Sequence, residues 1–254
     1  MTKDENALVK TYRATTQWNH WLTQFLGHNV LESEKKFLLR ALTNYYGKHT
    51  LLLGVPLQND LLKASVTAHQ VLLTPMISKT RQIKIIEAEL DELPIASGSV
   101  DLVLLPHTLE YLDNPRLLLS EACRIVKPEG HIVILGFNPF SFWGLKKMVA
   151  SNTNLPWSNN FIQANTVKKW LGLADFELVK QDSFLFRPPV LNHALYRRLK
   201  FLEWVGKKCY RPFGGVYVLV AKAKVIPLTP IRLRWEQGLS SIRTAIPGPT
   251  MRDF

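Results

Sequence analysis

Cysteine is scarce in this sequence, which holds only Cys123 and Cys209 among its 254 residues. The two lie far apart in helical patterns and form no metal-binding motif, so we expect no metal site. Sparse cysteine without an evident disulfide is typical of a reducing compartment. The sequence also lacks an apolar run long enough to cross a bilayer and a charged-then-apolar leader, so we expect a cytoplasmic protein without a signal peptide.

Acidic residues are also few, because 20 Asp and Glu stand against 32 Lys and Arg and leave a net charge of +12. The basic excess is strongest in residues 197–211, where Glu203 is the one acid. Such a surface favours anionic partners, among them nucleic acid, a membrane surface or a phosphorylated substrate. A solvated face that aids solubility is the simpler interpretation. No aromatic-interleaved basic motif supports nucleic-acid binding, and neither nucleic acid nor a membrane is the favoured partner.

An apolar content of 46% is ample for a folded core. Residues 1–48 show helical spacing, and we interpret Trp18 and Trp21 there as core residues rather than pocket residues. Strands and helices fill residues 49–224, and the proline- and arginine-containing residues 225–254 have no sustained period. The predicted organisation is therefore a helical cap (1–48), one α/β domain (49–224) and an extended basic tail (225–254).

The chain is organised around residues 101–111, an apolar strand that stops at Pro106 and opens into polar groups. An amphipathic helix follows from Pro115, then a turn at 128–130 and a second buried strand at 132–137. A strand–helix–strand unit with short turns is typical of a parallel sheet. Ligands of such sheets bind beyond the carboxyl ends of the strands, which here lie near His107 and Asn138.

Further strands are predicted on both sides of this unit. Three short ones precede it, at about residues 50–55, 68–73 and 83–88, and two follow at 176–186 and 215–222. Between the last two, residues 191–208 form an amphipathic helix with one basic face. Its apolar stripe most simply packs on the domain, and a role at a membrane surface or on an acidic partner is the second interpretation.

Several of these segments resemble the class I S-adenosylmethionine-dependent methyltransferases, and most of all their broad type 11 group. The resemblance is specific over about fifty residues and looser up to the last strand. It implies an α/β fold with a Rossmann-like seven-stranded methyltransferase sheet, preceded by N-terminal helices and carrying a helical insertion before the last strand. The matching segments are Leu93-Pro94, Ser97-Gly98-Ser99-Val100-Asp101-Leu102-Val103, His107-Thr108-Leu109-Glu110-Tyr111-Leu112 and Lys127-Pro128-Glu129-Gly130.

The resemblance implies S-adenosylmethionine as the cofactor and methyl transfer to a small or medium-sized acceptor as the function, with a small-molecule or anionic acceptor as the expected partner. Glu89 and Leu90 align with the acid-plus-apolar pair that holds the edge of the adenine in the family. The strand end at Pro106 and His107 aligns with the family segment that lies beside the sulfonium of the cofactor. The residues that the resemblance implies for cofactor binding are Leu53, Gly54, Val55, Thr74, Glu89, Leu90, Pro106 and His107.

The glycine-rich loop after the first strand departs from the family pattern. Only Gly54 matches, because Leu52 replaces the acid, and Pro56 and Gln58 replace glycines that let the backbone approach the cofactor. Leu72 stands where an acid would bind the ribose hydroxyls. Two functions therefore stay open: methyl transfer, which the matched second half favours, and an inactive methyltransferase-fold binding or scaffold protein, which the altered loop favours.

His107 and Asn138 are the candidate catalytic residues, because they follow the fourth and fifth strands. An unperturbed His107 has a pKa suited to taking a proton from the acceptor at neutral pH. A histidine that only hydrogen-bonds in the turn is the equal alternative, because methyl transfer from a sulfonium depends mainly on alignment and desolvation. Asn138, Phe140, Phe142 and Trp143 either line an acceptor pocket with an aromatic wall or pack at helical spacing.

Overall fold

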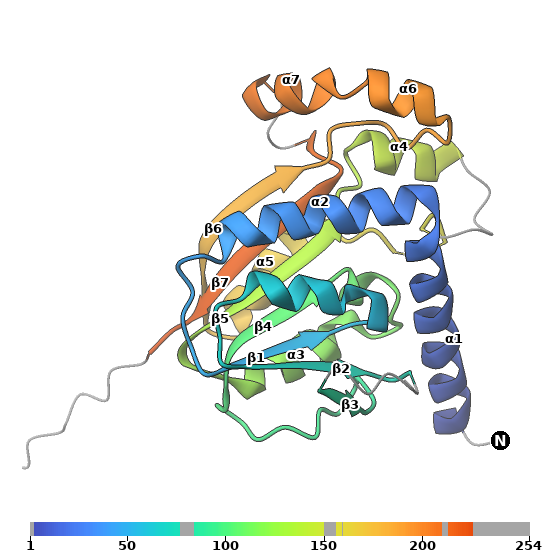
Figure 1. The fold of residues 1–254 in the computed structure, drawn as a ribbon. Coiled ribbons are helices and arrows are strands. Elements are labelled where there is room, and N and C mark those ends of the chain that lie inside the picture. The colour runs from blue at the N-terminus through green and yellow to red at the C-terminus, as the bar shows by residue number, and fades with distance from the viewer. Residues whose placement is uncertain (1–2, 77–83, 150–155, 159, 210–212, 226–254) are drawn as a thin grey trace, which may run out of the picture.

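The computed structural model describes residues 3–76, 84–149, 156–158, 160–209 and 213–225. Its centre is a seven-stranded mixed sheet with strand order β3-β2-β1-β4-β5-β7-β6 (Figure 1). Strands β1 to β5 pair in parallel, whereas β7 is antiparallel to both β5 and β6. This sheet confirms the predicted fold class. The strands are β1 (His49–Leu53), β2 (His69–Thr74), β3 (Ile85–Glu87), β4 (Val100–Pro106), β5 (Val126–Phe137), β6 (Phe176–Phe184) and β7 (Val216–Ala223).

Helices cover both faces of the sheet and its carboxyl edge (Figure 1). Helix α2 and the 3₁₀ helix η1 lie on one face, α3 and α5 lie on the other, and α1 crosses the carboxyl ends of the parallel strands. The helices are α1 (Lys3–Thr23), α2 (Phe25–Ala41), η1 (Pro56–Ala64), η2 (Thr108–Glu110), α3 (Pro115–Ile125), α4 (Phe142–Val149), α5 (Ala164–Leu173), α6 (His193–Arg198) and α7 (Phe201–Cys209).

The central strands are buried on both faces, which explains their nearly continuous apolar sequence. In β4 every residue except Asp101 is buried. Asp101 lies at the amino end of the sheet, where its carboxylate accepts hydrogen bonds from the backbone N–H groups of Lys48 and His49 and pairs with Lys127 at 3.0 Å. These hydrogen bonds outweigh the effect of burial and lower the pKa of Asp101. The Asp101 carboxylate thereby holds the start of β1 against β4.

Two predicted elements differ in detail from the structure. The single basic helix expected at 191–208 is two helices, α6 and α7, separated at Leu199 and Lys200. Gly130 does not turn into the fifth strand, because β5 already begins at Val126 and the left-handed residue is Glu129, with φ 67°. Both differences arise from local backbone breaks that leave the apolar periodicity unchanged, so the pattern alone does not reveal them.

The N-terminal helices pack closely on the sheet edge. Trp18 of α1 has no exposed surface and lies 5.4 Å from the His107 ring and 6.2 Å from the Phe137 ring, centroid to centroid. The division into a cap and a domain stays a prediction, and the predicted basic tail lies outside the described residues after Val225. No helix in the described part of the chain has the length and apolar character that crossing a membrane requires.

Replacing Trp18 with alanine tests how strongly α1 is joined to the sheet. We expect Trp18→Ala to lower the free energy of unfolding by about 3–5 kcal/mol, because it leaves a large cavity among buried rings. Urea unfolding followed by circular dichroism measures this loss. Tyr46→Ala is the control, since Tyr46 is 75% exposed and its loss should change stability by about 0.5 kcal/mol or less. A similar small effect for both variants would show that α1 contributes little to the core.

Candidate functional site

A cavity of about 930 Å³ lies where the carboxyl ends of β2 and β3 meet the first half of α1. Val9, Thr11 and Tyr12 of α1 form one side, and Leu117 of α3 closes another. The wall that follows β3 is acidic, in contrast to the basic chain as a whole. Its residues are Glu87, Ala88, Glu89, Leu90, Asp91 and Glu92.

The acidic wall combines polar and apolar groups that suit a nucleoside. The side chain of Glu89 is exposed to the cavity, and Leu90 next to it is 1% exposed and belongs to the core. Carboxylates accept hydrogen bonds from amino and hydroxyl groups, and the Tyr12 ring offers an apolar face to a flat base. The hydrogen-bond acceptors and the space of this cavity therefore fit the adenosyl half of S-adenosylmethionine.

The gap beside Gly54 is filled by Gln58. The Gln58 amide is fully buried, accepts a hydrogen bond from the Val55 N–H at 3.1 Å and donates one to the Pro106 carbonyl at 2.9 Å. A Cβ at Gly54 would come within 2.5 Å of the Gln58 amide oxygen, so only glycine allows this close contact. Gln58 thus bridges the ends of β1 and β4, and its amide fills the space beside Gly54.

His107 lies directly after β4 and is held between two carboxylates. Its Nε2 is 2.6 Å from Glu34 of α2 and its Nδ1 is 2.8 Å from Glu110 of η2, and all three side chains are buried. Burial by itself lowers the pKa of His107, but the two carboxylates outweigh it and raise the pKa to about 10. Burial raises the pKa of Glu110, against the opposing effect of His107 and of the Phe137 N–H, which donates to it.

The buried ion cluster of Glu34, His107 and Glu110 makes His107 a cation at neutral pH. A protonated imidazole has no free lone pair, so it does not take a proton from an acceptor. The structure therefore favours the hydrogen-bonding alternative for His107 over the base. Its backbone is left-handed, with φ 58°, a conformation that the two flanking carboxylates hold in place.

Aromatic rings continue from the ion cluster toward α4. Trp18 stacks near Trp21 at 4.8 Å, and Phe137 stacks on Trp143 at 5.2 Å with an interplanar angle of 13°. Within the described residues, the buried Trp18 Nε1 and the second carboxylate oxygen of Glu34 have no hydrogen-bond partner. An unpaired buried donor and an unpaired buried acceptor are costly, and a bound polar ligand or water relieves that cost.

A second cavity, of about 640 Å³, lies on the other side of this ring cluster. The second half of α1 lines it with Thr16, Gln17, His20 and Trp21, so α1 borders both cavities. Lys146 of α4 and Trp157 form the opposite side, and the Lys146 ammonium lies 5.2 Å from the Trp157 ring centre. Trp21 thus both packs in the core and lines a cavity, although we interpreted it as a core residue.

The predicted cofactor residues divide into two groups. Glu89 and Leu90 line the cavity under α1, whereas the other predicted side chains lie beneath it in the sheet edge. Leu53 and Val55 are fully buried, and the Leu53 carbonyl accepts a hydrogen bond from the Thr108 hydroxyl. Thr74 is also buried, and its hydroxyl accepts from the Met76 N–H at 3.3 Å.

Asn138 and its aromatic neighbours do not line one common pocket. Asn138 borders a separate cavity of about 420 Å³ together with Gln163 and Asp182. Phe140 lines both this cavity and a groove on the outer side of α4, whereas Phe142 lines only that groove and Trp143 is fully buried. The single aromatic-walled acceptor pocket that we considered is therefore absent from the described residues, and the catalytic role of Asn138 stays a prediction.

Glu34 and Tyr12 are site residues that the sequence reasoning missed. Glu34 falls on the buried stripe of α2, four residues from both Val30 and Leu38. A carboxylate on such a stripe is a signal, because buried acids are rare unless they are paired. Tyr12 is 45% exposed and gave no comparable signal.

Comparisons with known proteins agree with this geometry. The family described as "Methyltransferase domain" matches residues 42–134, from the end of α2 to β5. An uncharacterised protein of Escherichia coli, YafS, is 31% identical over 208 residues, which are 80% of each chain. A malonyl-[acyl-carrier protein] O-methyltransferase of Laribacter hongkongensis is 28% identical over 95 residues, 37% of this chain and 32% of that one.

Solved structures show the same fold at lower identity. An S-adenosylmethionine-dependent methyltransferase of Thermotoga maritima superposes with a TM-score of 0.65 at 17% identity, over 86% of this chain and all of that one. Three findings confirm the resemblance seen in the sequence. They are the family match, the similarity to YafS over 80% of each chain, and the strand order of the sheet. The chain belongs to the class I S-adenosylmethionine-dependent methyltransferases, and S-adenosylmethionine is its cofactor.

Proposed function

We propose that the protein methylates a small or medium-sized acceptor and binds the adenosyl half of S-adenosylmethionine in the cavity under α1. The observation that carries this proposal is the acidic wall after β3, at the carboxyl edge of a methyltransferase sheet. Glu89 accepts hydrogen bonds from the amino group of adenine, and Leu90 and Tyr12 pack against its ring. The cofactor itself supplies a methyl group that its sulfonium already activates.

Gln58 and α1 control access to the methionine end. Because the Gln58 amide fills the space beside Gly54, the side chain must turn away before a methionine group enters. That movement frees the Val55 N–H and the Pro106 carbonyl, which then bind the ligand in place of the amide. The same filled gap is the observation that favours the second candidate function, a binding protein that does not turn over.

His107 is a positioning residue in this proposal. Its charge joins Glu34 of α2 to Glu110, and Glu110 in turn holds the Phe137 N–H at the end of β5. The ion cluster thereby fixes the ends of β4 and β5 on either side of the reacting groups. Alignment and exclusion of water then provide most of the catalysis.

The cavity beside Trp21 is the acceptor site that this arrangement favours. It lies across the Trp18–His107 contact from the cofactor cavity and has room for a small or medium-sized molecule. Lys146 and Trp157 provide a cation and an apolar ring, and burial lowers the pKa of the Lys146 ammonium. An acceptor with an anionic group and an apolar body fits these groups best.

Calorimetric titration with S-adenosylhomocysteine tests the cofactor cavity. We expect the native protein to bind, and Glu89→Gln to bind about tenfold to a hundredfold more weakly, because one charge-assisted hydrogen bond is lost. Glu177→Gln is the matched control, since Glu177 is an exposed acid of β6 outside the cavity. No binding by native protein at millimolar ligand would refute the cofactor site, and equal weakening in both variants would refute the role of Glu89.

Shortening Gln58 tests the access model. We expect Gln58→Ala to bind S-adenosylhomocysteine several-fold more tightly than native protein, because no side chain has to be displaced, while its affinity for adenosine stays unchanged. A thermal melt of the same samples checks folding, since the change removes the Gln58 partner of the buried Val55 N–H, at a cost of about 1–3 kcal/mol, while the Pro106 carbonyl keeps the Thr108 hydroxyl at 3.4 Å. Weaker binding of S-adenosylhomocysteine with unchanged adenosine binding would instead make Gln58 a direct contact of the ligand.

The pH dependence of stability tests the charge of His107. The folded pKa of about 10 lies above the unfolded value of about 6.5, so the protonated cluster stabilises the fold fully below pH 6.5 and loses this effect as the pH rises to 10. We expect urea unfolding of native protein to show a decline of up to about 1.4 kcal/mol per pH unit in that window. His107→Gln should remove the decline and His69→Gln, at an exposed position, should keep it. A native protein of constant stability across this window would contradict the charged cluster.

A further inference from the structure

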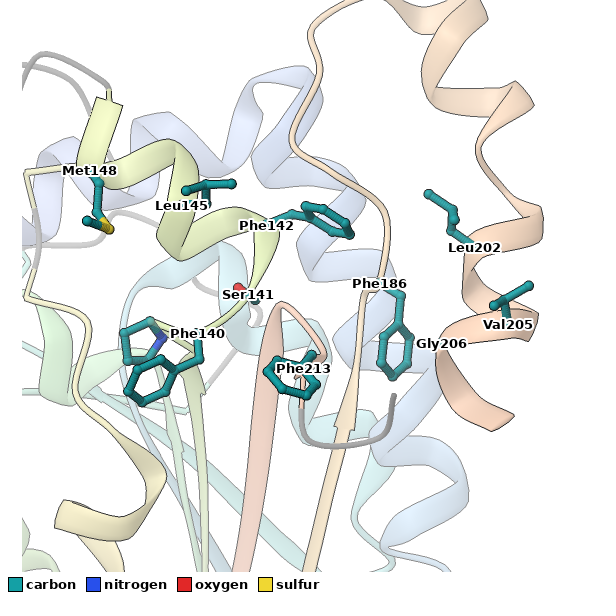
Figure 2. A pocket seen from close by; sticks show the side chains of 11 residues that line it. Phe140, Ser141, Phe142, Leu145, Met148, Phe186, Leu202, Val205, Gly206 and Phe213 are labelled. Carbon is teal, nitrogen blue, oxygen red and sulfur yellow. The ribbon is translucent and has the colours of Figure 1, made fainter. Parts of the chain in front are cut away.

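An apolar groove of about 520 Å³ lies between α4 and α7, at the carboxyl edge of the sheet (Figure 2). Phe142, Leu145 and Met148 line it from α4, and Leu202 and Val205 line it from α7. The Phe186 ring and Phe213 close the space between the helices. The groove shares no lining residue with the cavity under α1 or the cavity beside Trp21, so it is not part of the proposed methyl-transfer site.

The two walls of the groove are fixed to the domain. Trp143 anchors α4, because its fully buried ring donates a hydrogen bond to the Arg187 carbonyl at 3.0 Å. Lys146 donates to the carbonyl of Pro189 on the segment that leads to α6. Helix α7 packs through Gly206, where a Cβ would come within 2.1 Å of the Phe186 ring. Hydrogen bonds and close packing therefore hold both helices of the groove in place.

Large apolar side chains of the helices that form the groove are exposed to solvent. Met148 is 83% exposed and Phe140 is 64% exposed at α4 and the turn before it. On α7, Trp204 is 70% exposed and Phe201 is 59% exposed, whereas Leu202 and Val205 face the groove. Several exposed large apolar side chains in neighbouring helices mark an interaction site.

The segments that form this groove are also strongly basic. Residues 140–149 and 186–209 contain eight Lys and Arg and one acid, Glu203. Glu203 already pairs with Arg187 at 3.1 Å, so it does not neutralise the exposed cations of α6 and α7. The exposed cations on these helices and the turn between them are Arg197, Arg198, Lys200 and Lys208, and Lys208 lies 5.5 Å from the Trp204 ring centre.

We propose that the face formed by α4, α6 and α7 docks on the surface of an anionic lipid bilayer. The cations meet anionic headgroups, Trp204 and Phe201 enter the interface, and the groove receives an acyl chain. Nucleic acid would satisfy the cations and leave the apolar groove empty. A second copy of this chain would bring two basic faces together, which charge repulsion opposes.

Co-sedimentation of the full chain with lipid vesicles tests this proposal. We expect binding to vesicles that contain equal parts phosphatidylcholine and phosphatidylglycerol, weaker binding to phosphatidylcholine alone, and loss of binding as salt screens the charges. Trp204→Glu and Met148→Glu should each weaken binding to the mixed vesicles by roughly tenfold or more. Leu173→Glu is the matched control, because Leu173 is 77% exposed on α5 and should leave binding unchanged.

Several outcomes would overturn the proposal. These are no binding to either vesicle, equal binding to both, or equal weakening in the α4 or α7 variants and in Leu173→Glu. Self-association that Trp204→Glu abolishes, without any vesicle binding, would also overturn it and would assign the face to a second copy of the chain. If Trp204→Glu fails to fold, Met148→Glu carries the test alone. Binding of S-adenosylhomocysteine should be the same in all three variants, so this test is independent of the cofactor site.

Discussion

The buried ion cluster of Glu34, His107 and Glu110 is the interaction on which the carboxyl edge of this fold depends. It joins a helix that precedes the sheet to the ends of β4 and β5 through two short contacts of 2.6 and 2.8 Å. Removing one member of a buried charged set leaves the others uncompensated, at a cost of about 3–5 kcal/mol. Because the cluster lies where a parallel sheet binds ligands, the same contacts set both the position of α1 and α2 and the shape of the site.

The loop after the first strand of this chain is unusual for the family. In place of further glycines, the chain has Gln58, whose amide bonds to Val55 and Pro106 inside the gap. The cavity under α1 stays open with its acidic wall, whereas the Gln58 amide fills the space beside Gly54. The packing of this edge therefore bears directly on the proposed cofactor site.

Charge is divided between two surfaces of the molecule. The cavity after β3 collects Glu87, Glu89, Asp91 and Glu92, whereas residues 193–209, which include α6 and α7, contain five Lys and Arg against one acid. A net charge of +12 therefore describes neither site on its own. The acidic wall suits the amino and hydroxyl groups of a nucleoside, while the basic and apolar face suits an anionic lipid surface.

The sequence by itself determined the sheet, its parallel half and the late hairpin, because local apolar runs and turns encode them. The resemblance also predicted Glu89 and Leu90 as cofactor residues, and both line the cavity under α1. Only the tertiary structure decided the environment of His107, because one of the two carboxylates that raise its pKa is Glu34, 73 residues earlier in the chain. Tertiary packing likewise placed the Gln58 amide beside Gly54 and brought Met148 and Leu202 together around one groove. Each of these features depends on contacts between segments that no local pattern records.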